Sequence, residues 1–174
     1  MTHTSLRVAA LLALALFVFN SCAGYRVGNI SGKEVQGVKS VWVPMAKNQS
    51  YTPDIQATVT SAVVRRFDND GTLETQSAEK ADSQLDITIT EVRLNSLRST
   101  QDNVLITAEY QVQIEAKVTF TNRRTGRTVL REQPFSGVTS FYVQQDLQEG
   151  KRQALPQAAE NLAYNIVKRI TEGW

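Results

Sequence analysis

The two side chains most often used for catalysis and metal binding are nearly missing from this sequence. Its 174 residues include one histidine, His3, and one cysteine, Cys22. Both lie in the first 22 residues, so the rest of the chain cannot supply a Ser-His-Asp triad, a Cys-His pair or a histidine-based zinc site. An enzyme that works with two carboxylates, as glycosidases do, remains an alternative. No acidic pair stands out from the charged background, and the sequence predicts a protein that is not an enzyme and needs no cofactor or metal ion.

The residues before Cys22 predict an export signal. Arg7 precedes an apolar run over residues 8–19, which is too short to cross a bilayer because a transmembrane helix needs about 20 apolar residues. A secretory signal needs only about 7 to 15. The run ends in Phe-Asn-Ser-Cys, which resembles the lipobox of bacterial lipoproteins. We therefore predict a lipoprotein signal peptide over residues 1–21 and a lipid anchor on Cys22.

The lipobox resemblance implies what this cysteine would carry. Its sulfur would be diacylated, and its amine, freed when the signal is removed, would be acylated again. Stable anchoring takes two lipid signals, and each buried methylene contributes about 0.8 kcal/mol, so three acyl chains would hold the protein on a membrane. A buried or paired cysteine is the alternative, although the chain has no second cysteine for a disulfide.

The mature chain has the size of one domain and little net charge. Residues 22–37 mix glycine with polar residues and show no periodicity, which predicts a lipidated tether followed by a single domain over residues 38–174. Of the 19 basic and 17 acidic residues in the chain, only Arg7 lies in the signal, and 18 basic residues remain. Because the charges nearly balance, nucleic acid is not an expected partner.

The first part of the domain predicts a strand, a helix and a second strand. Residues 38–44 have the alternation of a short strand. Residues 48–67 place apolar side chains at helical spacing, with Thr52 suited to cap the helix and Pro53 suited to its first position. A brief strand is predicted over residues 72–76. We expect it to run parallel to the first strand, because strand–helix–strand units normally cross over in that way.

The middle of the chain predicts long antiparallel strands. Within residues 84–94 the apolar side chains change from one face to the other, which suggests a bulge or a twist near Thr90. Every even position from 104 to 120 is apolar and nearly every odd one is polar, as in a strand with one buried and one wet face. Residues 121–127 predict a hairpin turn. Residues 128–143 predict an outer strand, because their proline cannot donate a ladder hydrogen bond and is tolerated best at an edge.

A second helix, predicted over residues 152–170 with Pro156 in its first turn, completes the domain. The order of elements predicts an α+β fold, a two-layer sandwich in which two helices pack on one face of a four- to five-stranded mixed sheet with long antiparallel meander strands. The other face would be wet or would meet a polar partner. It carries the odd residues of the long strand: Glu109, Gln111, Gln113, Glu115 and Lys117.

Several motifs follow one another along the mature chain. They are "CAGYRVG", "VWVPMAKNQSYTPDI", "ADSQLDITITEV", "AEYQVQIEAKVTF", "TNRRTGRTVL" and the closing amphipathic helix. In this order they resemble the LptE family, the lipopolysaccharide-assembly lipoproteins of the outer membrane, which form the small subunit of the translocon that inserts lipopolysaccharide. The resemblance covers almost the whole mature chain and agrees with the fold predicted from periodicity.

The resemblance implies a non-catalytic function on the periplasmic side of the outer membrane, with the lipid as anchor. Proteins of this family lie in the lumen of a large outer-membrane β-barrel, help it to fold, plug it and bind lipopolysaccharide. The phosphates of lipid A need arginine or lysine donors. The candidates near strand ends are Arg93, Arg98, Arg123, Arg124 and Arg127.

Two alternatives accompany this interpretation. Another envelope lipoprotein of similar topology, of the curli-secretion or transport-auxiliary type, would form rings or pair with a transporter instead of occupying a barrel. The alternative for the five arginines is that they are ordinary solvated residues of strands and turns with no role in binding.

Overall fold

The computed structural model describes residues 37–98, 108–143 and 146–172, without the side chains of Arg98 and Ala108. Cys22, the predicted signal peptide and nearly all of the predicted tether lie outside the described residues. The first residues of the strand predicted from the even-position alternation also lie outside them.

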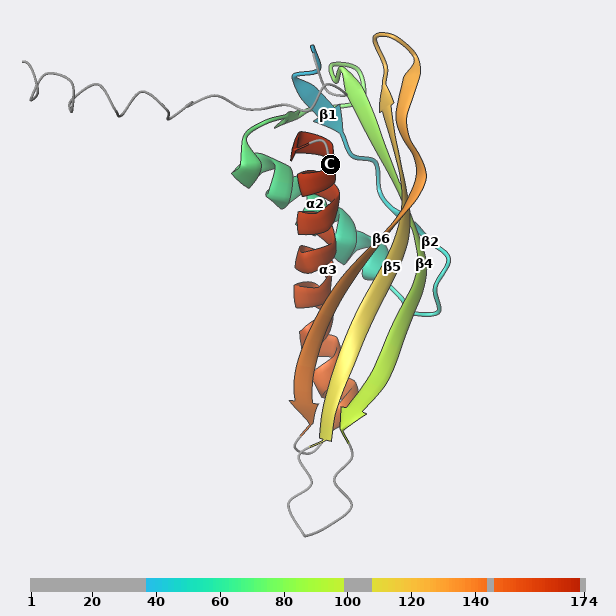
Figure 1. The fold of residues 1–174 in the computed structure, drawn as a ribbon, viewed down its shortest axis with the longest axis vertical. Coiled ribbons are helices and arrows are strands. Elements are labelled where there is room, and N and C mark those ends of the chain that lie inside the picture. Colours follow the sequence, from blue (N-terminus) through green and yellow to red (C-terminus); the bar gives the residue numbers. More distant parts are fainter. Residues whose placement is uncertain (1–36, 99–107, 144–145, 173–174) are drawn as a thin grey trace, which may run out of the picture.

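A six-stranded mixed sheet forms one layer, with strand order β3-β1-β4-β5-β6 and with β2 beside β4. The strands are β1 Ser40–Trp42, β2 Lys47–Asn48, β3 Glu74–Thr75, β4 Ser83–Arg98, β5 Ala108–Asn122 and β6 Arg127–Val143. β4, β5 and β6 form an antiparallel meander, whereas β1 is parallel to β3 and β4. Figure 1 shows the three long strands running along the molecule. The predicted parallel pairing is confirmed, and the two-residue β2, which the sequence did not predict, adds a strand to the predicted number.

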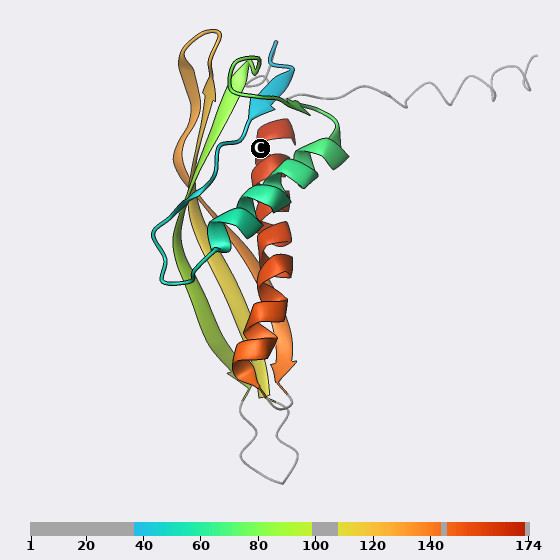
Figure 2. The same cartoon turned by 180° about the vertical axis from the view of Figure 1, so that it is seen from behind.

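Two helices, α2 (Ile55–Asp70) and α3 (Leu147–Glu172), form the second layer. Both cover the same face of the sheet, and α2 crosses α3 (Figure 2). α3 lies against β6 and β5, whereas α2 packs mainly on α3. The predicted α+β two-layer sandwich is confirmed.

Burial confirms the alternation in β5 and the change of phase in β4. The even residues of β5 that are buried are Val112, Ile114, Ala116, Val118 and Phe120. In β4, Ile89 pairs with Ala116 and Glu91 pairs with Glu115, so Thr90 is the extra residue of the predicted bulge. Before the bulge odd residues of β4 face the helices, and after it the even residues Val92 and Leu94 do.

The predicted starts of both helices are wrong. α2 begins at Ile55, after Asp54, which has a positive φ of 58° and makes no capping bond. Thr52 is not the cap; its carbonyl accepts a hydrogen bond from the Asn48 side chain at 2.8 Å, so the preceding loop is ordered by Asn48.

α3 begins at Leu147, more than one turn before the predicted start. The Asp146 carboxylate accepts a hydrogen bond from the backbone N–H of Gln148 at 2.8 Å, which satisfies one of the free donors at the helix start. Pro156 therefore lies inside the helix and not in its first turn. The cap sequence lies upstream of the apolar stripe, which is why the periodicity placed the start too late.

The outer edge of β6 is covered by side chains of α3. Asn161 donates a hydrogen bond to the Val138 carbonyl at 2.7 Å, and Asn165, one turn later, donates one to the Ser136 carbonyl at 2.8 Å. Both carbonyls belong to the edge strand, whose outer backbone groups would otherwise meet only water or another strand. The two asparagines therefore fix α3 to the sheet and block part of this edge.

We expect the double substitution Asn161→Ala, Asn165→Ala to lower the free energy of unfolding by about 1–3 kcal/mol, since each side-chain hydrogen bond contributes about 0.5–1.5 kcal/mol net. Urea unfolding followed by circular dichroism measures the change. Gln153→Ala is the matched control, because Gln153 is exposed and its hydrogen bond joins it to Glu149 on the same helix. A double variant as stable as the control would show that these bonds do not fix α3.

Candidate functional site

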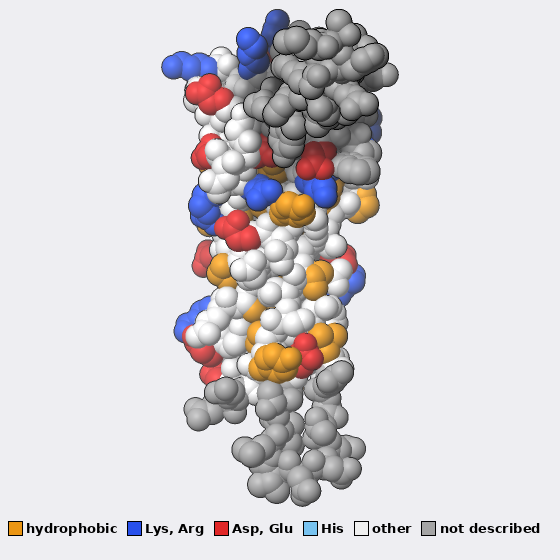
Figure 3. Space-filling view, turned by 60° about the vertical axis from the view of Figure 1, so that its left-hand side comes forward, with side chains coloured by type: hydrophobic (Ala, Val, Ile, Leu, Met, Phe, Trp, Pro, Cys, Tyr) orange, Lys and Arg blue, Asp and Glu red, His pale blue; other side chains and the backbone are white. Residues whose placement is uncertain are grey.

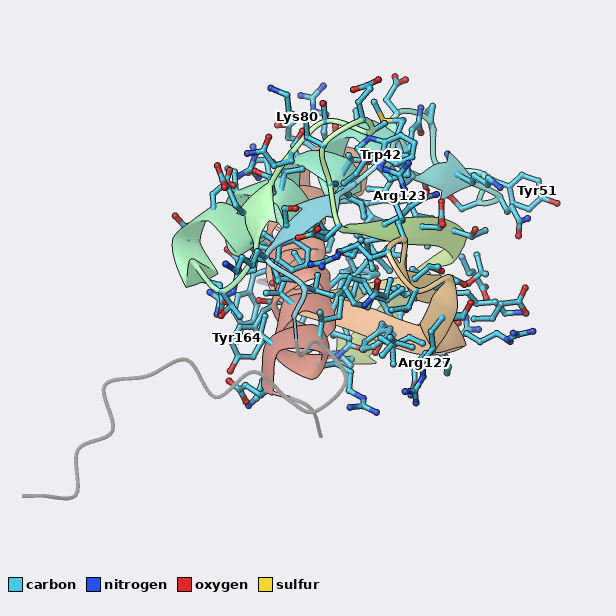
Figure 4. The ribbon with its side chains drawn as sticks, turned by 90° about the horizontal axis from the view of Figure 1, so that it is seen from above. Trp42, Tyr51, Lys80, Arg123, Arg127 and Tyr164 are labelled. Carbon is cyan, nitrogen blue, oxygen red and sulfur yellow. The ribbon has the colours of Figure 1, made fainter. Side chains whose placement is uncertain are left out.

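The structure brings three of the five candidate arginines together. Arg123 and Arg124 lie in the turn between β5 and β6, and Arg127 is the first residue of β6. The turn is tight, with Gly126 at a positive φ of 69°, as expected for the predicted hairpin. We call Arg123, Arg124 and Arg127 the basic hairpin. Figure 4 looks onto this end of the molecule and labels Arg123 and Arg127.

Two of these arginines also hold the hairpin in place. Arg123 donates a hydrogen bond to the Ala78 carbonyl, and its guanidinium lies 5.8 Å from the centre of the Trp42 ring. Arg124 donates to the Gly37 carbonyl at 3.1 Å and lies 3.9 Å from the Asp82 carboxylate. Each guanidinium has five N–H donors, so both retain donors for a ligand.

Arg127 has no such structural role. Its side chain is exposed, and among the described residues no hydrogen bond or ion pair engages it. Because its donors are free, Arg127 is the member of the basic hairpin best suited to bind an anion without breaking a contact of the fold.

Other cations surround the basic hairpin. Lys39 and Lys80 are exposed, and both belong to segments that meet the hairpin, since the backbone N–H groups of Lys39 and Arg123 both donate to Asp82. Acids lie at this end as well: Glu79 and Asp82 follow β3, and Asp68 bonds to Thr75 of β3, next to Glu74. A hydrogen bond from Ser77 is the main cause that lowers the pKa of Glu79, and the charge of Arg123 lowers this pKa further. The hairpin and its neighbours therefore present five exposed cations, among acids of the adjoining segments.

Arg93 is not part of this group. It lies on β4, ten residues beyond Ser83, the residue that pairs with Asn122 at the hairpin, so it is roughly 30 Å away at about 3.4 Å per residue. Arg98 lies farther along the same strand, and its side chain is outside the described part of the chain.

Two carboxylates already neutralise Arg93. Its guanidinium is 2.6 Å from Glu91 and 2.8 Å from Glu115 on the face of the sheet away from the helices. Hydrogen bonding by Arg93 lowers the pKa of Glu91, and the same bond raises the pKa of Arg93. A phosphate here would approach two carboxylates of its own sign of charge, which makes Arg93 a weaker anion site than the hairpin.

Sequence reasoning missed Trp42, Lys39 and Lys80 as neighbours of the hairpin. Trp42 had a usable signal, because it is out of phase with buried Val41 and therefore faces away from the helices. The two lysines had none, since their position depends on how the short parallel strands pair with the sheet.

Open cavities lie on the described surface. One of about 450 Å³ lies between the loop before α2 and the start of α3. Within residues 37–98, 108–143 and 146–172, no group of histidine, cysteine or acidic side chains is arranged to bind a metal ion. On the α3 side, hydrophobic side chains form small patches among polar and charged ones (Figure 3).

None of the helices in the described part of the chain is both long enough and apolar enough to cross a membrane.

Solved structures share this fold at low sequence identity. A hypothetical protein from Chlamydia trachomatis superposes with a TM-score of 0.54 at 13% identity, covering 77% of this chain and 96% of that one. A homolog of a neuraminyllactose-binding hemagglutinin from Helicobacter pylori gives 0.51 at 12%, covering 86% and 90%. A protein from Caulobacter crescentus classed as a lipoprotein gives 0.50 at 7%, covering 74% and 89%. These similarities concern the fold alone.

Comparison with curated protein sequences finds no match. Family models give a clear result, however. The model described as "LptE: Lipopolysaccharide-assembly" matches residues 38–170, which is well over half of the chain and nearly all of the described domain. The chain therefore belongs to the LptE family of lipopolysaccharide-assembly proteins.

Proposed function

We propose that this protein is held by a lipid on Cys22 at the periplasmic side of the outer membrane, where it partners and plugs a large β-barrel and binds lipopolysaccharide during assembly. The observation that carries the proposal is the family match over residues 38–170. The proposed function is non-catalytic. It needs no histidine, and the one histidine of the chain, His3, precedes the predicted anchor.

The sheet face opposite the helices suits a barrel lumen. Its side chains on β5 are polar or charged, and Glu109, Gln111, Gln113 and Glu115 are half-buried while Lys117 is exposed. The interior of an outer-membrane barrel is polar and water-lined. A plug with this face would need no large apolar surface to fit there.

The basic hairpin is the proposed contact for the phosphates of lipid A. Charge-assisted hydrogen bonds to phosphate are the strong ones, and guanidinium groups form them in pairs. Arg123, Arg124 and Arg127 present three such groups at one end of the sheet. Arg98 stays a candidate by position only, and Arg93 is a weaker candidate because two carboxylates lie beside it.

We expect Arg127→Glu to weaken lipopolysaccharide binding about tenfold and Arg123→Glu, Arg124→Glu to weaken it further, because one lost hydrogen bond to a charged group is about 1.5–3 kcal/mol. Capture of purified lipopolysaccharide on the immobilised full mature chain, over a series of concentrations, measures the affinity. Lys151→Glu at the start of α3 is the control with the same change of charge as Arg127→Glu, and Lys151→Glu, Arg152→Glu is the control for the double variant.

Circular dichroism separates binding from folding in these variants. Arg127→Glu should retain the native spectrum, since no hydrogen bond or ion pair within the described residues engages the exposed Arg127 side chain. If the hairpin variants bind as tightly as the α3 control, the hairpin is not the phosphate site.

A further inference from the structure

The half of β4 beyond its bulge is an open sheet edge. Before the bulge, β4 is flanked by β1 at Ser83 and Gln84 and by β2 at Thr88 and Ile89. Over residues 91–98, no other described strand pairs with it on that side. Alternate residues there direct their backbone N–H and C=O groups away from β5. The edge is about 27 Å long at about 3.4 Å per residue, and Figure 1 shows it along the right-hand side below β2.

The other long edge of the sheet is protected by several devices. β6 contains Pro134, and it has an irregularity opposite Thr119 at which Glu132 has a positive φ of 45°. Asn161 and Asn165 cover two of its carbonyls. Proline, bulges and covering side chains are the means by which proteins prevent strand addition.

The open edge of β4 has little of this protection. Its sequence, EVRLNSLR, contains no proline or lysine, and its irregularity lies at the far end, between Ser96 and Arg98. Arg93 is drawn onto the flat face of the sheet by Glu115 and so does not extend over the edge. The contrast indicates that the edge of β6 is closed to a further strand and that the edge of β4 is open to one.

Incompletely buried apolar side chains accompany the open edge. Val92 and Leu94 face the helix layer but are only partly buried, because α3 lies against β6 and β5. Leu97 is 45% exposed. At the upper end of the edge, a cavity of about 220 Å³ lies between residues 49–51 and residues 90–92. Tyr51 at this cavity is fully exposed and points outward in Figure 4.

We propose that an extended strand of a protein partner adds to β4 along residues 91–98, in line with β2. Main-chain hydrogen bonds would give affinity, and alternate side chains would give specificity. One face of the added strand carries apolar residues that complete the burial of Val92 and Leu94. The other face carries a lysine or arginine beside Glu91, because Glu91 and Glu115 share one cation, Arg93. The identification of that partner as the β-barrel rests on the proposed function.

Hydrogen exchange of the backbone amides tests the proposal. The full mature chain is compared free and in the complex that it forms in the cell envelope, extracted with mild detergent. We expect amides in residues 91–98 to exchange at least about tenfold more slowly in the complex, and those of residues 136–140, on the covered edge of β6, to change little. A complex that contains the barrel but leaves residues 91–98 unprotected overturns the edge proposal and leaves the proposed function standing.

The same measurement separates the remaining outcomes. If the complex contains another identified protein and residues 91–98 are protected, the edge proposal holds and the barrel assignment fails. If no partner is found and no protection is gained, both fail.

A pair of variants gives a second readout. Asn95→Lys, Leu97→Lys places cations on the open edge, and we expect it to reduce recovery of the partner at least about fivefold. The control Gln133→Lys, Ser140→Lys changes two exposed residues of β6 in the same way. Equal recovery with both double variants overturns the proposal.

Discussion

Replacing Gly137 with valine is expected to prevent α3 from packing on β6. A Cβ atom at position 137 would lie 2.1 Å from the Ala158 carbonyl oxygen and 2.4 Å from the Leu162 backbone nitrogen. Both are backbone atoms of α3, so the whole helix would have to move. Overpacking typically lowers the free energy of unfolding by about 1–3 kcal/mol. We expect a loss of at least about 3 kcal/mol here, because backbone atoms cannot change rotamer to make room as a side chain can.

Urea unfolding followed by circular dichroism tests this expectation. Gly137→Ala introduces the same Cβ atom with less bulk. Its stability is measured instead if the valine variant cannot be obtained as folded protein. Ser140→Val, on the same strand but at an exposed position, is the control for changing β6 itself. If Gly137→Ala is as stable as the natural protein, α3 does not pack as closely on β6 at Gly137 as the structure shows.

The second large effect is expected from Phe120→Ala. Phe120 is fully buried in the core under the helices, and loss of a buried phenylalanine lowers the free energy of unfolding by about 3–5 kcal/mol. Tyr142→Ala removes an aromatic side chain from the same sheet where it is 64% exposed, and surface changes usually stay within about 0.5 kcal/mol. Equal losses in the two variants would contradict the assignment of the buried face.

Much of the sheet was predictable because its physical cause is local. A strand with one buried face must alternate, and β5 does so over its described length. The bulge at Thr90 was predictable because an extra residue reverses the phase of the apolar side chains. The edge position of β6 followed from the missing N–H of Pro134.

Other features depend on contacts that are distant in sequence. The two-residue β2 has no periodicity to detect. Gly137 is visible in the sequence, but its need for a glycine follows only from the path of α3. The two Asn side chains at positions 161 and 165 are polar residues on an amphipathic helix until β6 is placed beside them.

The candidate site was only partly predictable for the same reason. The predicted hairpin turn implied that Arg123, Arg124 and Arg127 would lie together, because they are close in sequence. The pairing of Arg93 with Glu115 requires the register between β4 and β5, so the sequence could not show that Arg93 is neutralised. Cys22 is a prediction from its own sequence context and lies outside the described residues.

The fold and the proposed function are linked through the two sides of the sheet. One side is closed by helices that bury the core, and the other is polar on β4 and β5 and carries Val138 and Tyr142 on β6. The ends of the molecule also differ, since three exposed arginines lie at the hairpin and the open part of β4 lies toward the opposite end. The proposed contacts with an anionic lipid, a barrel wall and an added strand would therefore use separate surfaces of the protein.

The composition of the complex isolated from the cell envelope in mild detergent tests the central claim most directly. We expect the full mature chain to be recovered with an equal amount of one large β-barrel protein and with bound lipopolysaccharide. A ring that contains only copies of this chain, or a chain that leaves the envelope without detergent and has no partner, would contradict the account.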